Sequence, residues 1–298
     1  MQAVVAGDLV ADLRRSIAQV TSADGGWSYY PGRESRIEPT CWAMLALSAT
    51  GGEAIRVEQG LSYLHGRQRA AGRLLEDSVG TVNYGWNGLA LLTDVVVSGP
   101  SSSPWRSRLV DALLAAKGVA LPNSPALRQD NQLQAWSWID GTFSWVEPTA
   151  LCVLALKKAG MSGPAAARLE EAELMLFDRV CDAGGWNYGN AEVLTQDLRP
   201  YVPTTALALL ALQDRRDHPV VRRSLDWLVA HATAEHASMA LSLAAQCLQV
   251  FGLPADAPRA LLVEQQARTG FLGNVHLMSM ALLTLGAVNG APPPLALS

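Results

Sequence analysis

Two carboxylates occupy equivalent places in a repeated sequence. Glu38 and Glu147 each begin a Glu-Pro-Thr segment, and each segment leads into an apolar helix, at about 38–49 and 148–157. A carboxylate near the free N–H groups of a helix start stabilises the helix, so helix capping is one interpretation of both residues. The other is chemical: burial in an apolar cavity raises the pKa of a carboxyl and keeps it protonated near neutral pH. If the protein is an enzyme, we expect Glu147 and Glu38 to be its acid/base groups.

Other residues that could bind a ligand fall at the corresponding ends of further apolar helices. We expect them to ring one mouth of a cavity, with the aromatic members forming a collar. These candidates are Asn83, Tyr84, Trp145, Trp186, Tyr201 and His276. Aromatic faces can stabilise a cationic carbon. The structural alternatives are a hydrogen-bonded core histidine for His276 and packing between helical layers for Trp186.

The helices that would position these residues alternate between two kinds. Amphipathic segments lie at about 5–19, 53–69, 104–117, 164–180, 219–232 and 257–268. Segments that are apolar on every side lie at about 38–49, 87–97, 148–157, 204–213, 237–250 and 275–288. A helix without a polar face must be enclosed by other elements, whereas an amphipathic helix can border water. The alternation therefore predicts an inner and an outer layer of helices.

The repeat also predicts how the layers close. Asp24-Gly25-Gly26-Trp27 and Asp182-Ala183-Gly184-Gly185-Trp186 precede apolar helices, and Asn83-Tyr84-Gly85-Trp86 is a diverged copy. Such repeats are typical of arrays of one supersecondary unit. The chain begins on an outer helix and ends on an inner one, so its two ends should pair, whereas an open solenoid would carry polar caps. We predict an all-α fold, a closed (α/α)6 toroid of six inner and six outer helices, as one domain over 1–298 with a flexible tail at 291–298.

Composition excludes several classes of function. The net charge of −4 over 298 residues argues against nucleic-acid binding and against a basic membrane-binding surface. Apolar runs are too short for the roughly 18–20 residues of a spanning helix. The four cysteines are far apart and three lie in apolar helices, which indicates reduced core residues of a cytoplasmic protein. They are Cys41, Cys152, Cys181 and Cys247.

One local motif resembles a known family. Gly60-Leu61-Ser62-Tyr63-Leu64, followed by Gln68 and Gly72, is similar to the glutamine–tryptophan motif of triterpene cyclases, with Leu74 in place of the final tryptophan. Gln19 with Gly25 and Trp27 is a partial copy, as is Gln266 with Gly270. With these motifs the chain resembles the prenyltransferase and squalene-cyclase repeat superfamily over essentially its whole length. The resemblance implies the toroid, in which such motifs join outer helices to the following turns.

The catalytic signatures of that superfamily are only partly present. Class II terpene cyclases carry Asp-x-Asp-Asp-Thr-Ala, and the corresponding Trp145-Val146-Glu147-Pro148-Thr149-Ala150 keeps a carboxyl only at the middle, proton-donating position, Glu147. Protein prenyltransferases bind zinc through Asp-x-Cys and a histidine, and the corresponding residues are Glu235-His236-Ala237 and His276. Glu235, His236 and His276 are therefore candidate metal ligands, but without the cysteine we expect no metal, no other cofactor and no protein prenylation.

Two functions follow as hypotheses. The first is a terpene cyclase-like enzyme that binds an isoprenoid or another apolar small molecule in an axial cavity and catalyses an acid/base-assisted cyclisation or isomerisation. The second is a toroid without catalysis that binds a lipid or a protein. Carboxyls that face the cavity beside aromatic rings would favour the enzyme, and carboxyls that face solvent or cap their own helices would favour the alternative.

Overall fold

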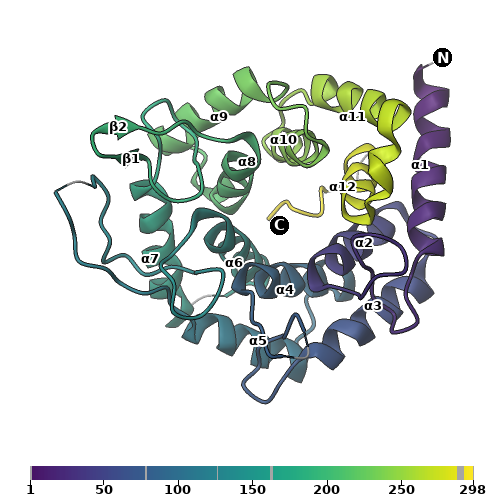
Figure 1. Cartoon of the computed structure of the whole chain (residues 1–298), viewed down its shortest axis with the longest axis horizontal. Helices are drawn as coiled ribbons and strands as arrows, with labels where there is room; N and C mark the ends of the chain where they lie inside the picture. Colours follow the sequence, from purple (N-terminus) through teal and green to yellow (C-terminus); the bar gives the residue numbers. More distant parts are fainter. Residues whose placement is uncertain (1, 78, 126, 162–163, 287–291, 298) are drawn as a thin grey trace.

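The computed structural model of the chain describes residues 2–77, 79–125, 127–161, 164–286 and 292–297. In this part of the chain, α-helices form two concentric layers, as predicted (Figure 1). The inner helices are α2 (Ile37–Thr50), α4 (Tyr84–Ser98), α6 (Val146–Lys158), α8 (Val202–Ala211), α10 (Ser238–Val250) and α12 (Val275–Leu285). The outer helices are α1 (Gln2–Gln19), α3 (Ala54–Arg67), α5 (Pro104–Ala115), α7 (Pro164–Asp178), α9 (Pro219–His231) and α11 (Asp256–Thr269).

Contacts between helices close the ring. Each inner helix packs against the next, and α12 packs against both α2 and α1. The first and last helices of the described chain thus lie in contact, and Figure 1 shows α1 beside α12 at the seam. The inner helices are enclosed because they have no polar face: every residue of α8 is buried. None of the described helices combines the length and apolar character that a membrane-spanning helix requires.

Three repeats share one set of buried hydrogen bonds between the layers. In each, the backbone N–H of a fully buried tryptophan donates to a threonine hydroxyl of the next inner helix. These pairs are Trp27–Thr40, Trp136–Thr149 and Trp186–Thr205, at 2.9, 3.1 and 2.9 Å. Each indole N–H donates to a carbonyl of the preceding outer helix, those of Ile17, Leu113 and Leu176, at 2.8, 2.9 and 2.6 Å. We call this arrangement the tryptophan–threonine staple.

The diverged second repeat keeps the same geometry with other residues. Leu74 takes the place of the tryptophan, and its N–H donates to Asn87 Oδ1 at 2.7 Å, while Asn87 Nδ2 donates back to the Leu74 carbonyl at 3.1 Å. The loss of tryptophan at Leu74 is thus offset by an asparagine that satisfies both backbone groups. Gln68 joins this turn to the next outer helix, because its amide donates to the Trp105 carbonyl at 2.9 Å. This is the role that the resemblance implied for the motif.

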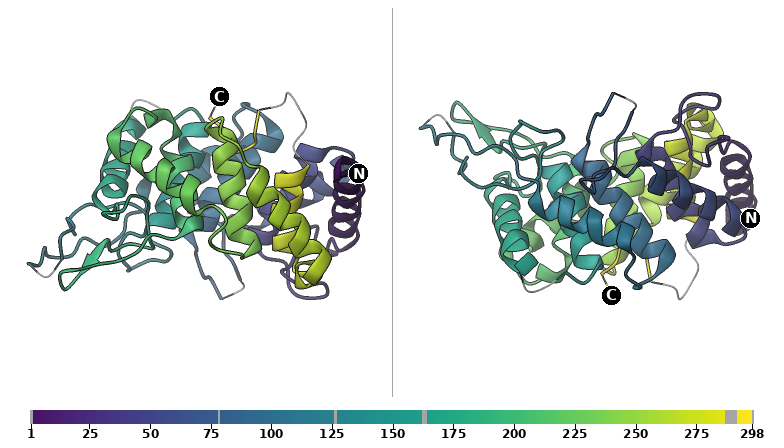
Figure 2. Two further views of the ribbon diagram at one scale, coloured as in Figure 1. Left: turned by 90° about the horizontal axis from the view of Figure 1, so that it is seen from above. Right: turned by 90° about the horizontal axis from the view of Figure 1, so that it is seen from below.

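Two long segments rise from one face of the ring. They are the connection from α5 to α6 and the connection from α7 to α8, and both extend away from the face that carries the C-terminus (Figure 2). The staple partners of the second segment, Trp186 and Thr205, are 19 residues apart, whereas Trp27 and Thr40 are 13 apart. The additional residues form a hairpin of β1 (Glu192–Val193) and β2 (Gln196–Asp197). Short 3-10 turns, η1 (Gln213–Arg215) and η2 (Gly270–Gly273), complete the elements of the described chain.

The segment expected to be a flexible tail is held in place in its described part, 292–297. Gln213 Nε2 donates to the Leu295 carbonyl at 2.9 Å, and Gln213 Oε1 accepts from the Leu297 N–H at 2.8 Å. The Lys158 ammonium donates to the Ala296 carbonyl, and Leu295 is buried. The segment ends near the ring axis (Figure 1), on the face opposite the long connections. Residue 291 and residue 298 lie outside the described part of the chain.

The staple gives a direct stability prediction. Thr149→Val keeps the shape of the side chain but leaves the buried Trp136 N–H without its acceptor, which should lower the free energy of unfolding by about 1–3 kcal/mol. Urea denaturation followed by circular dichroism measures it. Thr93→Val is the matched control, because the Thr93 hydroxyl donates to the Leu89 carbonyl of its own helix and its loss orphans no backbone N–H. Equal losses in the two variants would contradict this role of the staple.

Candidate functional site

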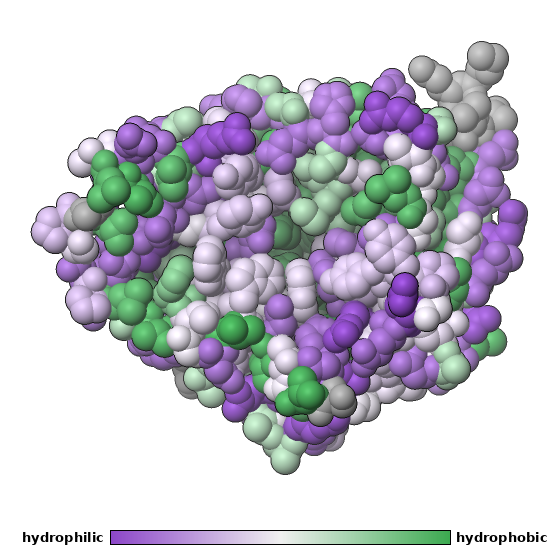
Figure 3. Space-filling view, in the orientation of Figure 1, coloured by the Kyte–Doolittle hydropathy of each residue, from purple (hydrophilic) through white to green (hydrophobic). Residues whose placement is uncertain are grey.

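A cavity of about 200 Å³ lies on the ring axis, inside the first turns of the inner helices. Five of these helices line it with residues four apart, since such residues share one helix face. The pairs are Glu38–Trp42, Glu147–Leu151, Pro203–Leu207, Met239–Leu243 and His276–Met280, and Trp86 and Trp138 complete the wall. The space-filling view along the axis shows this face hollowed between the inner helices (Figure 3). The cavity is thus mostly apolar with three ionisable side chains at its mouth.

Glu38 faces the cavity and does not cap its own helix. Its Oε2 accepts a hydrogen bond from the Tyr29 hydroxyl, and its side chain makes no hydrogen bond to the free N–H groups of α2. Only 8% of the residue is exposed. Burial raises the pKa of Glu38 to about 7, although the Tyr29 hydrogen bond acts in the opposite direction. Near neutral pH this carboxyl is therefore present in both protonated and ionised forms.

His276 stands beside Glu38 as a neutral group. Its Nε2 lies 3.6 Å from Glu38 Oε1, too far for a hydrogen bond, and this buried nitrogen has no hydrogen-bond partner among the described residues. Burial lowers the pKa of His276 to about 4, so the two groups do not form an ion pair near neutral pH. Its ring packs 6.2 Å from Trp42 and 6.0 Å from Tyr29, centroid to centroid. His276 is thus a buried polar group whose ring nitrogen is available to a ligand.

Glu147 lies across the cavity mouth on α6. Its Oε1 accepts a hydrogen bond of 2.9 Å from the Thr204 hydroxyl at the start of α8, and it does not cap α6. Burial raises the pKa of Glu147, the Thr204 hydrogen bond lowers it, and the Glu38 charge adds a small further increase. Both predicted carboxyls therefore border the cavity, which is the arrangement that favours an acid/base role over capping.

The aromatic residues around the cavity are largely not the ones we predicted. Trp42, Trp86 and Trp138 line it, with Trp86 and Trp138 in contact at 5.0 Å between ring centroids. Trp42 could have been found from its spacing, because it lies four residues after Glu38 on an inner helix. Trp138 could not, since a loop carries it and the absence of a side chain at Gly85 admits its ring. A Cβ at that glycine would lie 2.5 Å from the indole.

Three predicted ligand-binding residues lie outside the cavity and have structural contacts. Asn83 caps α4, where its Oδ1 accepts from the Trp86 N–H at 2.9 Å. The Tyr84 hydroxyl donates to Asp140 Oδ1 at 2.6 Å, and Trp186 is fully buried in a staple. The prediction that these side chains line the mouth is therefore corrected. The sequence pattern correctly indicated that the cavity lies at the first turns of the inner helices. It did not indicate which side chains there point into the cavity, because that depends on the loop that precedes each helix.

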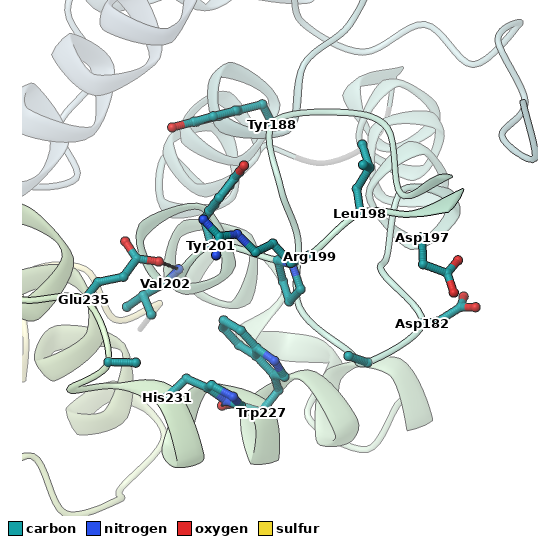
Figure 4. A pocket seen from close by; sticks show the side chains of 13 residues that line it. Asp182, Tyr188, Asp197, Leu198, Arg199, Tyr201, Val202, Trp227, His231 and Glu235 are labelled. Carbon is teal, nitrogen blue, oxygen red and sulfur yellow. Dashed lines mark hydrogen bonds between the residues drawn. The ribbon is translucent and has the colours of Figure 1, made fainter. Parts of the chain in front are cut away.

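Trp145 and Tyr201 line a groove beside the cavity instead. The groove consists of two adjoining hollows of about 810 and 550 Å³ between the α7–α8 connection, α9 and the end of the α5–α6 connection. The two hollows meet at Tyr188 and Tyr201, which lie side by side in Figure 4 with Trp227 opposite them. Arg199 lies between these rings. We call this feature the aromatic groove; in the sequence, only the length of the two connections pointed to it.

The candidate metal ligands do not converge. Glu235 Oε1 accepts from the Val202 N–H at 2.9 Å and so caps α8, and the His236 carbonyl accepts from Gln265. His276 lines the cavity with Glu38. The described residues contain no group of three or more histidine, cysteine, aspartate or glutamate side chains that could hold a metal ion.

Comparison with known proteins identifies the fold. In sequence, the chain matches no protein-family model and no curated protein. In structure, it is similar to a single-substitution variant of the type II terpene cyclase MstE from Scytonema in complex with the substrate geranylgeranyl dihydroxybenzoate, with a TM-score of 0.65, 14% identity, and 95% of this chain and 97% of that chain covered. A protein from Actinoplanes has a TM-score of 0.66 and 16% identity, with 95% and 100% covered.

A second enzyme class shares the architecture. An inactive α-1,6-mannanase of Salegentibacter sp. HEL1_6 in complex with α-1,6-mannotetrose has a TM-score of 0.66 and 9% identity, with 94% of this chain and 99% of that chain covered. At these identities the likeness concerns the fold alone. The chain therefore has the α/α toroid that is also found in type II terpene cyclases and α-1,6-mannanases.

The raised pKa of Glu38 predicts how stability changes with pH. The folded state holds this proton more tightly than the unfolded chain, whose pKa is near the ordinary 4.5, so the stabilisation is fully present below about pH 4.5 and is lost as pH rises through about 7. Relative to Glu38→Gln, the wild-type protein should thus lose on the order of 3 kcal/mol over that interval. Urea denaturation of both proteins from pH 4.5 to 7.5 measures the difference.

Comparing the two proteins removes the opposite effect of His276, which both contain. The lowered pKa of His276 makes stability fall as pH drops from about 6.5 towards 4. Glu58→Gln is the control, since Glu58 is exposed on α3. A difference between wild type and Glu38→Gln that does not change with pH would show that this carboxyl is solvated.

Proposed function

We propose that the protein binds a small apolar molecule, of the isoprenoid kind, in the axial cavity and moves a proton on it in an isomerisation or cyclisation. The observation that carries the proposal is the pair of carboxyls, Glu38 and Glu147, on one apolar cavity. Neither carboxyl caps its own helix, and burial raises the pKa of both. Perturbed carboxyls that converge on a cavity are typical of acid/base sites.

Different surroundings suit the two carboxyls to different roles. Glu38 is the proton donor, because with a pKa near 7 it remains partly protonated at neutral pH. Glu147 is the acceptor, because the Thr204 hydroxyl stabilises its ionised form. A proton passes from Glu38 to an unsaturated carbon, and another leaves the resulting cation for Glu147. Trp42, Trp86 and Trp138 would stabilise the positive charge in between.

The size of the cavity limits the buried part of the ligand. A cavity of roughly 150 Å³ accommodates benzene, so a cavity of about 200 Å³ takes an apolar group of about eight to ten carbon atoms. That corresponds to a short isoprenoid or to one end of a longer one. The likeness to a cyclase that binds a geranylgeranyl compound supports the class of ligand. The proposal includes a cytoplasmic location, which agrees with four buried, unpaired cysteines.

The alternative is a toroid that binds a lipid or a protein without turnover. It is favoured by the residues that flank Glu147, since Trp145 and Pro148 provide no second carboxylate to tune the acid. The catalytic function and the binding of a lipid share the cavity and differ in proton transfer alone. An experiment that measures binding and proton exchange separately therefore distinguishes them.

Deuterium incorporation provides that experiment. In D2O, the protein should place deuterium on carbon in a ten-carbon isoprenoid alkene or alcohol, which mass spectrometry detects. Glu38→Gln and Glu147→Gln should each slow incorporation by roughly 100-fold or more. Both variants should still bind the compound, as measured by quenching of the cavity tryptophans. Lipids that co-purify with the protein would supply the natural compound for the same assay.

Two controls locate the event. Leu207→Trp should fill the cavity and abolish both binding and exchange, whereas Leu174→Trp, on the exposed side of α7, should change neither. Binding that Leu207→Trp abolishes without any deuterium incorporation would support the non-catalytic alternative. If the protein did not bind the isoprenoid, or bound it equally well with Leu207→Trp, the proposed site would be contradicted.

A further inference from the structure

The axial cavity and the aromatic groove adjoin at the starts of two inner helices. Trp145, directly before α6, borders the groove, and Glu147 in the first turn of α6 borders the cavity. Tyr201, directly before α8, borders the groove, and Pro203 in α8 borders the cavity. The groove loop is tied to α6 here, because the Val146 N–H donates to the Tyr188 carbonyl at 3.0 Å. The cavity and the groove therefore lie next to each other at these two helix starts.

The groove presents a succession of aromatic rings. Three contacting pairs line it, with centroid separations of 4.8, 5.0 and 4.3 Å. They are Phe143–Trp145, Tyr188–Tyr201 and Trp227–His231. Tyr188 is half exposed, so its ring is open to a ligand. Aromatic rings arranged along a groove offer flat apolar faces to a ligand that itself contains several rings. A closed aromatic cage would instead surround a single group.

The charged residues of the groove indicate which kind of polar ligand group it can bind. Asp182, Asp197 and Glu235 border it together with Arg199, so it has no excess of positive charge for a phosphate or another anion. The Arg199 guanidinium lies 5.8 Å from the centre of the Tyr201 ring, where a cationic ligand would otherwise bind. A neutral ring with hydroxyl groups fits both features. Its C–H face packs on aromatic rings, and its hydroxyls donate to carboxylates.

We infer that the ligand is an amphiphile, with a short apolar segment in the axial cavity and a neutral, polyhydroxylated, sugar-like head group in the aromatic groove. This inference rests on the proposed function for the apolar segment alone. The groove residues supply the head-group specificity and take no part in proton transfer. Tyr188 and Trp227 are the specificity-determining side chains, since they provide ring faces on the two sides of the groove (Figure 4).

Three probes separate the two halves of the site: n-octanol, maltose, and n-octyl maltoside below its micelle concentration. Isothermal titration of the full chain should show the maltoside binding at least tenfold more tightly than octanol. Tyr188→Ala should weaken the maltoside roughly fivefold to tenfold, the loss expected for one aromatic face, and leave octanol unchanged. Leu207→Trp should weaken both octyl compounds. Tyr30→Ala, at another exposed tyrosine, is the control and should change neither.

The outcomes distinguish this inference from the proposed function. Octanol that binds as tightly as the maltoside, or a Tyr188→Ala variant that weakens both equally, would overturn the head-group assignment and leave the cavity proposal intact. If the maltoside bound no more tightly than maltose, and Leu207→Trp did not change its affinity, both the head-group assignment and the cavity proposal would be overturned. Unchanged circular dichroism and melting temperature of Tyr188→Ala, whose side chain is half exposed, establish that the variant is folded.

Discussion

The structure depends on inner helices that cannot border water. Their side chains are mostly apolar on every side, so an outer helix must cover one side and the neighbouring inner helices must cover the flanks. A ring satisfies this requirement for every inner helix at once, provided that the last helix meets the first. The contact of α12 with α2 and α1 supplies that closure. The tryptophan–threonine staples then fix the spacing of the two layers, because each satisfies a backbone N–H and an indole N–H in a region without water.

The same constraint determines where chemistry can occur. Within the ring, the buried side chains of the inner helices are mostly apolar, and the described C-terminal segment lies against the far face with Leu295 buried. Polar groups reach the axis at the first turns of the inner helices, where Glu38, Glu147 and His276 border the cavity. Because these groups are removed from water, the pKa values of the two carboxyls are raised and that of His276 is lowered. Both directions favour the neutral form of the group. The shifted pKa values of these groups are thus a consequence of enclosure.

The fold could be predicted from the sequence because it follows from periodicity. The alternation of apolar and amphipathic segments determines the layers, and the unpaired end helices determine closure. Glu38 and Glu147 could be predicted for the same reason, since helix register places them at one mouth. Trp138 could not, because its position depends on a loop and on the room left by Gly85. Trp186 follows two glycines, as Trp27 does in the first repeat. The recurrence of this pattern indicated packing between the layers, which is the role that the staple gives both tryptophans. The aromatic groove depends on long connections whose paths no periodicity describes.

The central claim is that an apolar guest shares an enclosed cavity with the Glu38 carboxyl. Titration of that carboxyl by 13C NMR, with and without a ten-carbon isoprenoid, tests it most directly, using Glu38→Gln to assign the signal. We expect a pKa near 7 in the free protein and a higher value when the guest displaces any remaining water. A pKa near the ordinary value of about 4.5 that the guest does not change would contradict the claim.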